Sequence, residues 1–211
     1  MRRGEHIPLY TLEGVKDAEV TTHWFHTEDG LGLTFLRFQR HPGGDAVMVV
    51  HGLTTSTDMF IMPEHENLVS HLLDRGYDVW CLDYRMSNRH VYNLYKHRWT
   101  LDDVALYDIP AAISTIRGEI GREHPLHVVA HCLGATVFAM SLFARLVDVD
   151  SAILNSVALT PRVPRWSKVK LSYAPGLVDG VLGVPYLNPR WSDDPGFTRG
   201  EMVARAVSFF H

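Results

Sequence analysis

Cys132 lies at the centre of the segment of the chain best suited to chemistry, Ala130-His131-Cys132-Leu133-Gly134. Small residues occur two positions before and two positions after it, as in the G-x-S-x-G nucleophile elbow, with alanine for the first glycine and cysteine for the serine. Such a turn strains the backbone of its central residue and leaves no room for large neighbours. We therefore expect Cys132 to be a nucleophile that attacks acyl carbonyls.

The surroundings of Cys132 favour a reactive thiol. A thiol at the beginning of a helix is favoured as the thiolate by the helix dipole and by free amide groups. The alternative is a small buried core residue, which is common for a free cysteine. For Cys81, between Trp80 and Leu82 in a predicted strand, the same comparison favours burial.

An acyl-transfer site also needs donors for the oxyanion. The first expected donor is the backbone amide of Leu133, and the second is the amide of Leu53 in the loop after the strand 46–50. The alternative for this loop is an ordinary turn that requires Gly52. His131 is adjacent to Cys132 and is expected to face away from it, so we interpret His131 as structural.

The elements that must position these residues begin with a hairpin. Two β-rich runs, 22–25 and 33–38, flank a turn that contains Asp29-Gly30. Further along the chain, strands alternate with helices. Strands are expected at 46–50, 77–82, 126–130 and 151–159, and helices around Leu68–Leu73, from Thr100 to Gly121 with a kink at Pro110, and at 136–146.

This alternation predicts an α/β fold with a mostly parallel sheet, helices on both faces and an antiparallel N-terminal hairpin. Ligands then bind at the carboxyl ends of the strands. We assign residues 1–160 to this core. Prolines punctuate the remainder, and we interpret residues 161–211 as a cap or lid over the site.

Composition excludes several classes of function. The chain has 211 residues and a net charge of −4, which gives no field that attracts nucleic acid. Two cysteines cannot form a disulfide scaffold, and thirteen histidines without clustered cysteines do not indicate zinc. We expect no metal and no cofactor. The N-terminus leads into no apolar signal segment, so we expect a cytoplasmic protein.

Four segments together resemble the α/β-hydrolase superfamily, and within it the acid-lipase and cholesteryl-esterase-like branch. They are Val50-His51-Gly52-Leu53, Gly76-Tyr77-Asp78-Val79-Trp80, the block from Leu101 to Ala111, and the elbow at Cys132. The resemblance covers about Leu33 to Thr160. It implies a carboxylic ester hydrolase acting on a lipid or sterol ester, with water or an alcohol resolving the acyl-enzyme.

Two further resemblances leave alternatives open. A similar domain occurs with cholesterol-oxidase-type flavoproteins, which implies a flavoprotein oxidoreductase as a partner. Polyhydroxyalkanoate synthases are also similar and place cysteine at this corner. The alternatives to an esterase are therefore an acyltransferase of that kind and a non-catalytic module that binds lipid or a flavoprotein.

In this superfamily an acid and a histidine follow the nucleophile at the ends of later strands. The later aspartates of this chain end no convincing strand, and the only later histidine is His211. We therefore expect the acid and the base to lie beyond His211, and the core to be C-terminally incomplete. Removing such groups costs many powers of ten in turnover.

The cap contains a basic and aromatic stretch that could contact an anionic lipid surface. The alternative is a solvated cap segment. The stretch consists of Arg162, Arg165, Trp166, Lys168, Lys170 and Tyr173.

Overall fold

The structure is a computed structural model that describes residues 12–53, 55–64, 66–94 and 97–157. Six strands occur in this part: β1 (Glu19–His26), β2 (Gly32–Gln39), β3 (Ala46–Val50), β4 (Asp78–Asp83), β5 (Leu126–His131) and β6 (Ser151–Asn155). Its α-helices are α1 (Leu68–Asp74), α2 (Leu101–Asp103), α3 (Ile109–Ile120) and α4 (Leu133–Phe143), and a π-helical segment, Val104–Asp108, joins α2 to α3. Short 3-10 helices span Leu12–Gly14, Thr57–Phe60 and Val91–Leu94.

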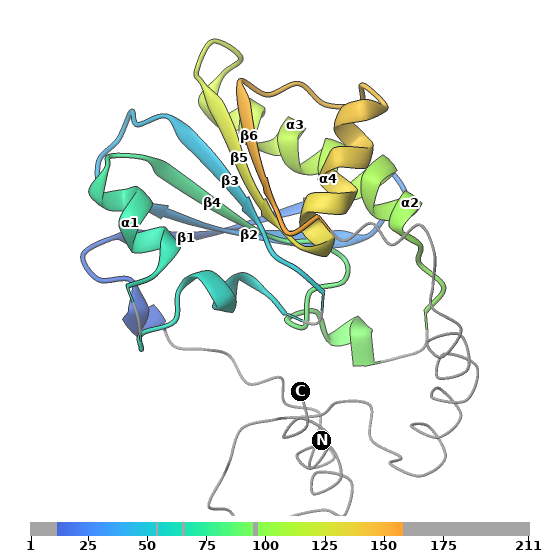
Figure 1. The fold of residues 1–211 in the computed structure, drawn as a ribbon, viewed down its shortest axis with the longest axis horizontal. Coiled ribbons are helices and arrows are strands. Elements are labelled where there is room, and N and C mark those ends of the chain that lie inside the picture. Colours follow the sequence, from blue (N-terminus) through green and yellow to red (C-terminus); the bar gives the residue numbers. More distant parts are fainter. Residues whose placement is uncertain (1–11, 54, 65, 95–96, 158–211) are drawn as a thin grey trace, which may run out of the picture. The chain divides into compact units, whose positions relative to one another are not determined.

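The strands form one sheet in the order β1-β2-β4-β3-β5-β6 (Figure 1). β1 pairs with β2, and β2 with β4, in antiparallel fashion, whereas β3 pairs in parallel with both β4 and β5. β6 extends the parallel part beyond β5. The predicted α/β fold with a mostly parallel sheet and an N-terminal hairpin is therefore confirmed.

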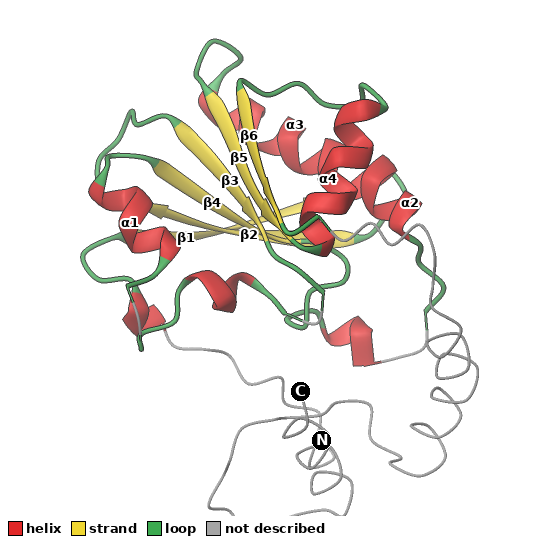
Figure 2. Cartoon of the chain, in the orientation of Figure 1, coloured by secondary structure: helices red, strands yellow, loops and turns green. Residues whose placement is uncertain are grey.

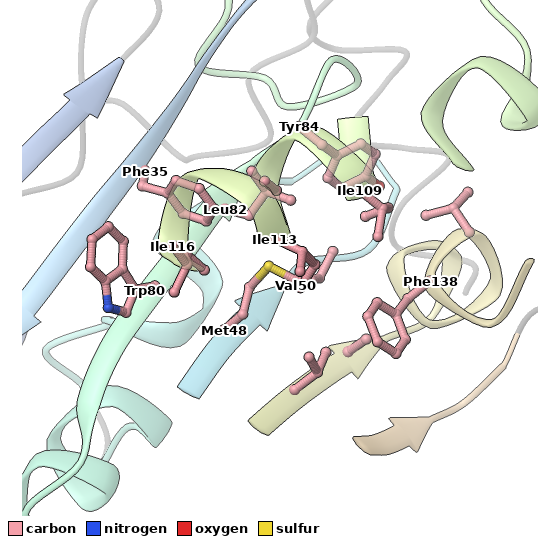
Figure 3. Packing of buried hydrophobic residues seen from close by; sticks show 14 of the residues in the cluster. Phe35, Met48, Val50, Trp80, Leu82, Tyr84, Ile109, Ile113, Ile116 and Phe138 are labelled. Atoms are coloured by element: carbon pink, nitrogen blue, oxygen red, sulfur yellow. The ribbon is translucent and has the colours of Figure 1, made fainter. Parts of the chain in front are cut away.

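Helices cover both faces of this sheet, as the strand sequences require (Figure 2). β3 is buried along its whole length, because Met48 and Val50 point to one face and Val47 and Val49 to the other. The first face packs against α3 and α4. Figure 3 shows this cluster, in which β3 side chains lie among those of α3 and α4 such as Ile113. The second face packs against α1.

Two local details differ from the sequence-based expectation. Helix α4 begins at Leu133, immediately after Cys132, rather than at Thr136, and strand β6 ends at Asn155. A π-helical segment, Val104–Asp108, ends just before α3, in which Pro110 is the second residue, and the kink at Pro110 stays a prediction. The predicted cap, residues 161–211, lies outside the described residues.

No helix in the described part of the chain combines the length and the apolar character that crossing a bilayer requires.

Candidate active site

The β5–α4 connection is a one-residue turn at Cys132. This residue has φ of 53° and ψ of −119°, a backbone conformation that residues other than glycine rarely adopt. The turn is fixed from one side because the Cys132 amide donates to the carbonyl of Asn155 in β6 at 2.9 Å. The Cys132 side chain is half-buried, whereas Cys81 is completely buried in β4.

The small neighbours of Cys132 are required by close packing. A Cβ atom added at Gly134 would overlap the carbonyl oxygen of His51 and lie 2.9 Å from Cγ1 of Val50. Ala130, on the other side of the turn, is completely buried. The first turn of α4 therefore presses against the end of β3, and only glycine fits at this contact.

The two predicted oxyanion donors lie on segments that meet at Cys132. Leu133 is the first residue of α4, so its amide has no acceptor within that helix. The loop after β3 passes close by, because a Cβ atom on Gly52 would lie 3.1 Å from Cβ of Cys132 and 3.5 Å from Cδ2 of His131. Leu53 follows Gly52, and its side chain is exposed. The structure thus brings together the three residues assigned to the site.

A buried carboxylate that the sequence analysis did not single out holds the loop after β3. Asp83, the last residue of β4, accepts hydrogen bonds from the amide and hydroxyl of Thr57 at 2.9 and 2.8 Å and from the hydroxyl of Ser87 at 2.8 Å. Asn88 reinforces the same link through its amide, which donates to the carbonyl of Thr55 at 3.1 Å. The loops after β3 and β4 are therefore one hydrogen-bonded unit.

His51 and Tyr84, the first residues after β3 and β4, stack on each other. Both side chains are buried, and their rings stack with centroids 4.4 Å apart. Burial lowers the pKa of His51 despite the Asp83 carboxylate 3.7 Å from its Nε2, so the imidazole is neutral near pH 7. Its Nδ1 donates to the carbonyl of Gly52 at 2.8 Å.

A second buried network fixes the chain just beyond Tyr84. The Arg85 guanidinium donates from Nε and Nη2 to Asp108 at 2.8 and 2.6 Å, and the Arg85 amide also donates to Asp108. The same guanidinium pairs with Asp29 in the β1–β2 turn at 2.9 Å. Asp108 belongs to the block that resembles the family, but its partner could not be read from that block.

The acid and the base that the resemblance implies were expected beyond His211, and His211 itself lies outside the described residues. Within the described residues, none forms a hydrogen bond with the thiol of Cys132. Asp148 and Asp150 lie in the loop that precedes β6, and Asp150 there accepts from the amide of Leu126 at 2.8 Å. The site as described therefore provides a nucleophile position and amide donors.

Comparison with known proteins places this geometry in a family. A family model described as alpha/beta hydrolase fold matches residues 45–199, which include β3, the turn at Cys132 and β6. The chain belongs to the alpha/beta hydrolase fold family. The resemblance drawn from the sequence motifs is thereby confirmed.

Several curated relatives of this alpha/beta hydrolase are lipases. Triacylglycerol lipase 2 of Arabidopsis thaliana is 31% identical over 192 residues, which are 78% of this chain and 44% of the lipase. Human gastric triacylglycerol lipase is 29% identical over 191 residues, which are 80% of this chain and 46% of the lipase. The chain spans about half the length of these relatives.

Among solved structures, an esterase of Pyrococcus furiosus resembles this alpha/beta hydrolase with a TM-score of 0.59. The match covers 83% of this chain and 69% of the esterase at 19% sequence identity. At this identity the likeness supports the fold.

Proposed function

We propose that the protein hydrolyses carboxylic esters with Cys132 as its nucleophile. The observation that carries this proposal is the strained turn at Cys132, which places a thiol between β5 and the first amides of α4, beside the loop that contains Gly52. Strain of this kind persists only where the surrounding structure enforces it, and it concentrates at sites of chemistry.

The mechanism follows from the groups around the turn. The thiol of Cys132 loses its proton to solvent water, and its sulfur attacks the acyl carbon and forms a C–S bond while the carbonyl electrons move to oxygen. The amides of Leu133 and Leu53 hold this oxyanion. Its collapse breaks the C–O bond and releases the alcohol, which takes up a proton. Water then hydrolyses the thioester and restores the thiol.

The relatives support a lipid ester as the substrate class, since both curated proteins named above are triacylglycerol lipases, and a sterol ester stays a prediction from the sequence. We retain residues 161–211 as the proposed cap, and its basic and aromatic stretch as the proposed contact with a lipid surface. A cytoplasmic location and a flavoprotein partner stay predictions from the sequence.

The proposal is tested by acylating the protein with p-nitrophenyl butyrate. We expect a burst of nitrophenolate and a butyryl adduct on the peptide that contains Cys132, measured by mass spectrometry. The peptide that contains Cys81 is an internal control, because its thiol is buried and burial raises its pKa. Cys132→Ala should remove the adduct and lower the burst rate at least ~1000-fold.

The same assay separates the alternatives. A hydroxyacyl thioester that is converted to polymer with release of free thiol would indicate an acyltransferase instead. Wild-type protein that never forms an adduct, but binds lipid as well as Cys132→Ala does, would indicate a non-catalytic module and contradict the proposal.

A further inference from the structure

The peptide between Gly52 and Leu53 is held from its carbonyl side by two side chains. His51 Nδ1 donates to the Gly52 carbonyl at 2.8 Å, and the hydroxyl of Tyr84 donates to the same oxygen at 3.2 Å. A carbonyl oxygen has two lone pairs, so both bonds can form together. The orientation of this peptide plane is therefore set by the side chains of the residues that directly follow β3 and β4.

Fixing the carbonyl also fixes the amide of the next residue. The Gly52–Leu53 bond is trans and planar, so the N–H of Leu53 points away from the Gly52 carbonyl. The oxygen faces the stacked rings of His51 and Tyr84, and the N–H points to the opposite side of the peptide. Oxyanion donors are effective only when their direction is set before the reaction.

Tyr84 is well suited to this task because its hydroxyl stays protonated. Burial is the largest cause that raises its pKa, and the nearby Cys132 and Asp108 charges raise it further. The phenol therefore stays protonated near neutral pH and is available as a donor to the Gly52 carbonyl.

Hydrogen bonds on both sides of Tyr84 fix its backbone. The carbonyl of Tyr84 accepts from the amide of Ser87 at 2.8 Å, and the amide of Arg85 donates to Asp108 at 2.9 Å. The ring is part of the core cluster that also contains Ile109 (Figure 3). The hydroxyl therefore has little freedom to follow a displaced Gly52 carbonyl.

We infer that Tyr84 is a positioning residue that directs the Leu53 amide toward the acyl oxygen during attack by Cys132. The inference rests on the proposed function and adds to it a residue that acts through a peptide group. Tyr84 acts through the Gly52–Leu53 peptide, with His51 as the second donor to the same carbonyl.

The test compares Tyr84→Phe with Tyr92→Phe. Both variants lose one hydroxyl that donates to a backbone carbonyl, because Tyr92 donates to Gly32 at 3.4 Å in β2. Tyr84→Phe keeps the ring stacked on His51. We expect it to slow acylation of Cys132 by p-nitrophenyl butyrate by about 3- to 10-fold, the range of one neutral hydrogen bond, with KM unchanged. Tyr92→Phe should acylate at the wild-type rate.

Two further readouts distinguish positioning from general damage. Alkylation of Cys132 by iodoacetamide needs no oxyanion donor, so its rate should be the same in both variants and in the wild type. Hydrogen exchange at the Leu53 amide, which needs no reaction at Cys132, should be faster in Tyr84→Phe alone.

The outcomes separate this inference from the proposed function. Three results would overturn the role of Tyr84 without affecting the proposed ester hydrolysis. They are slower acylation in both variants, slower alkylation in Tyr84→Phe, and unchanged hydrogen exchange at the Leu53 amide. Wild-type protein without an acyl adduct on Cys132 would overturn the proposed function, and the positioning role of Tyr84 with it.

Discussion

Gly134 shows how a single residue keeps the turn at Cys132 tight. The end of β3 approaches the first turn of α4 so closely that the backbone at this position has no room for a side chain. Flexible side chains can move out of the way, but the obstacle here is the carbonyl oxygen of His51, which belongs to the end of a buried strand. Any side chain must therefore separate α4 from β3.

Gly134→Ala should destabilise the protein by about 3 kcal/mol, the upper end of the usual range for overpacking, because the backbone itself must shift. Gly118→Ala in α3 is the matched control, since a Cβ atom there meets nothing within 4 Å. It should stabilise by about 0.5–1 kcal/mol, the helix preference of alanine over glycine. Urea unfolding of both variants checks this, and equal effects would contradict the packing argument.

The residues of the site differ in how far the sequence could predict them. Cys132 and Gly134 belong to a local pattern, because a strand, a reactive residue and a helix follow one another directly. Tyr84 follows β4, and its partner Gly52 lies in the loop after β3. That contact depends on β3 and β4 being neighbours in parallel register, which no local pattern encodes.

At the scale of elements, one carbonyl of the π-helical segment before α3 receives its hydrogen bond from a side chain of another helix. The amide of Ile109 donates to Val104, and Pro110 has no amide, so neither can serve the carbonyl of Ala105. The hydroxyl of Ser141 in α4 lies 2.7 Å from that carbonyl and donates to it. Both residues are buried.

Ser141→Ala should therefore destabilise the protein by about 1–3 kcal/mol, because it leaves a buried carbonyl without a donor. Thr115→Ala is the control. Thr115 makes an equivalent bond to Ala111 at 2.8 Å, but it is only half-buried and lies in a regular helix. This control should change stability by less than about 0.5 kcal/mol. Thermal unfolding of both variants decides, and a Ser141→Ala effect as small as that of Thr115→Ala would argue against the assignment.

Element boundaries were predictable where the capping residues were local. Thr100 and Asp103 form a capping box at the start of α2, and Gly76, just after α1, has a positive φ of 83°. The start of α4 was misplaced because Leu133 has no conventional capping side chain before it. The π-helical segment accepts a hydrogen bond from Ser141, which is distant in sequence, so the residues around Pro110 could not indicate that segment.

On the scale of the whole molecule, two buried histidines couple stability to pH. Burial lowers the pKa of His51 and of His90 below the ordinary value of 6.5, despite the Asp83 carboxylate that faces both. The unfolded chain therefore binds more protons than the folded protein once the pH falls below about 6.5. Burial raises the pKa of Asp108, which acts in the opposite direction but closer to the ordinary aspartate value of 3.8.

The free energy of unfolding should accordingly fall between pH 7 and 5.5, by at most about 1.4 kcal/mol per pH unit for each histidine. His90→Gln should show a shallower fall, because glutamine does not titrate and keeps an N–H group for the Asp83 carbonyl, to which His90 donates at 2.8 Å. Urea unfolding across this range provides the measurement. A variant with the same slope as the wild type would exclude His90 as a source.

Arg85 links segments of the fold that are distant in the sequence. Its guanidinium joins the β1–β2 turn, the end of β4 and the beginning of α3, three segments separated by dozens of residues. A charge buried in this way is costly until both carboxylates are in place. None of these segments can therefore separate without leaving the Arg85 charge uncompensated, so the hairpin, β4 and α3 should unfold as one cooperative unit.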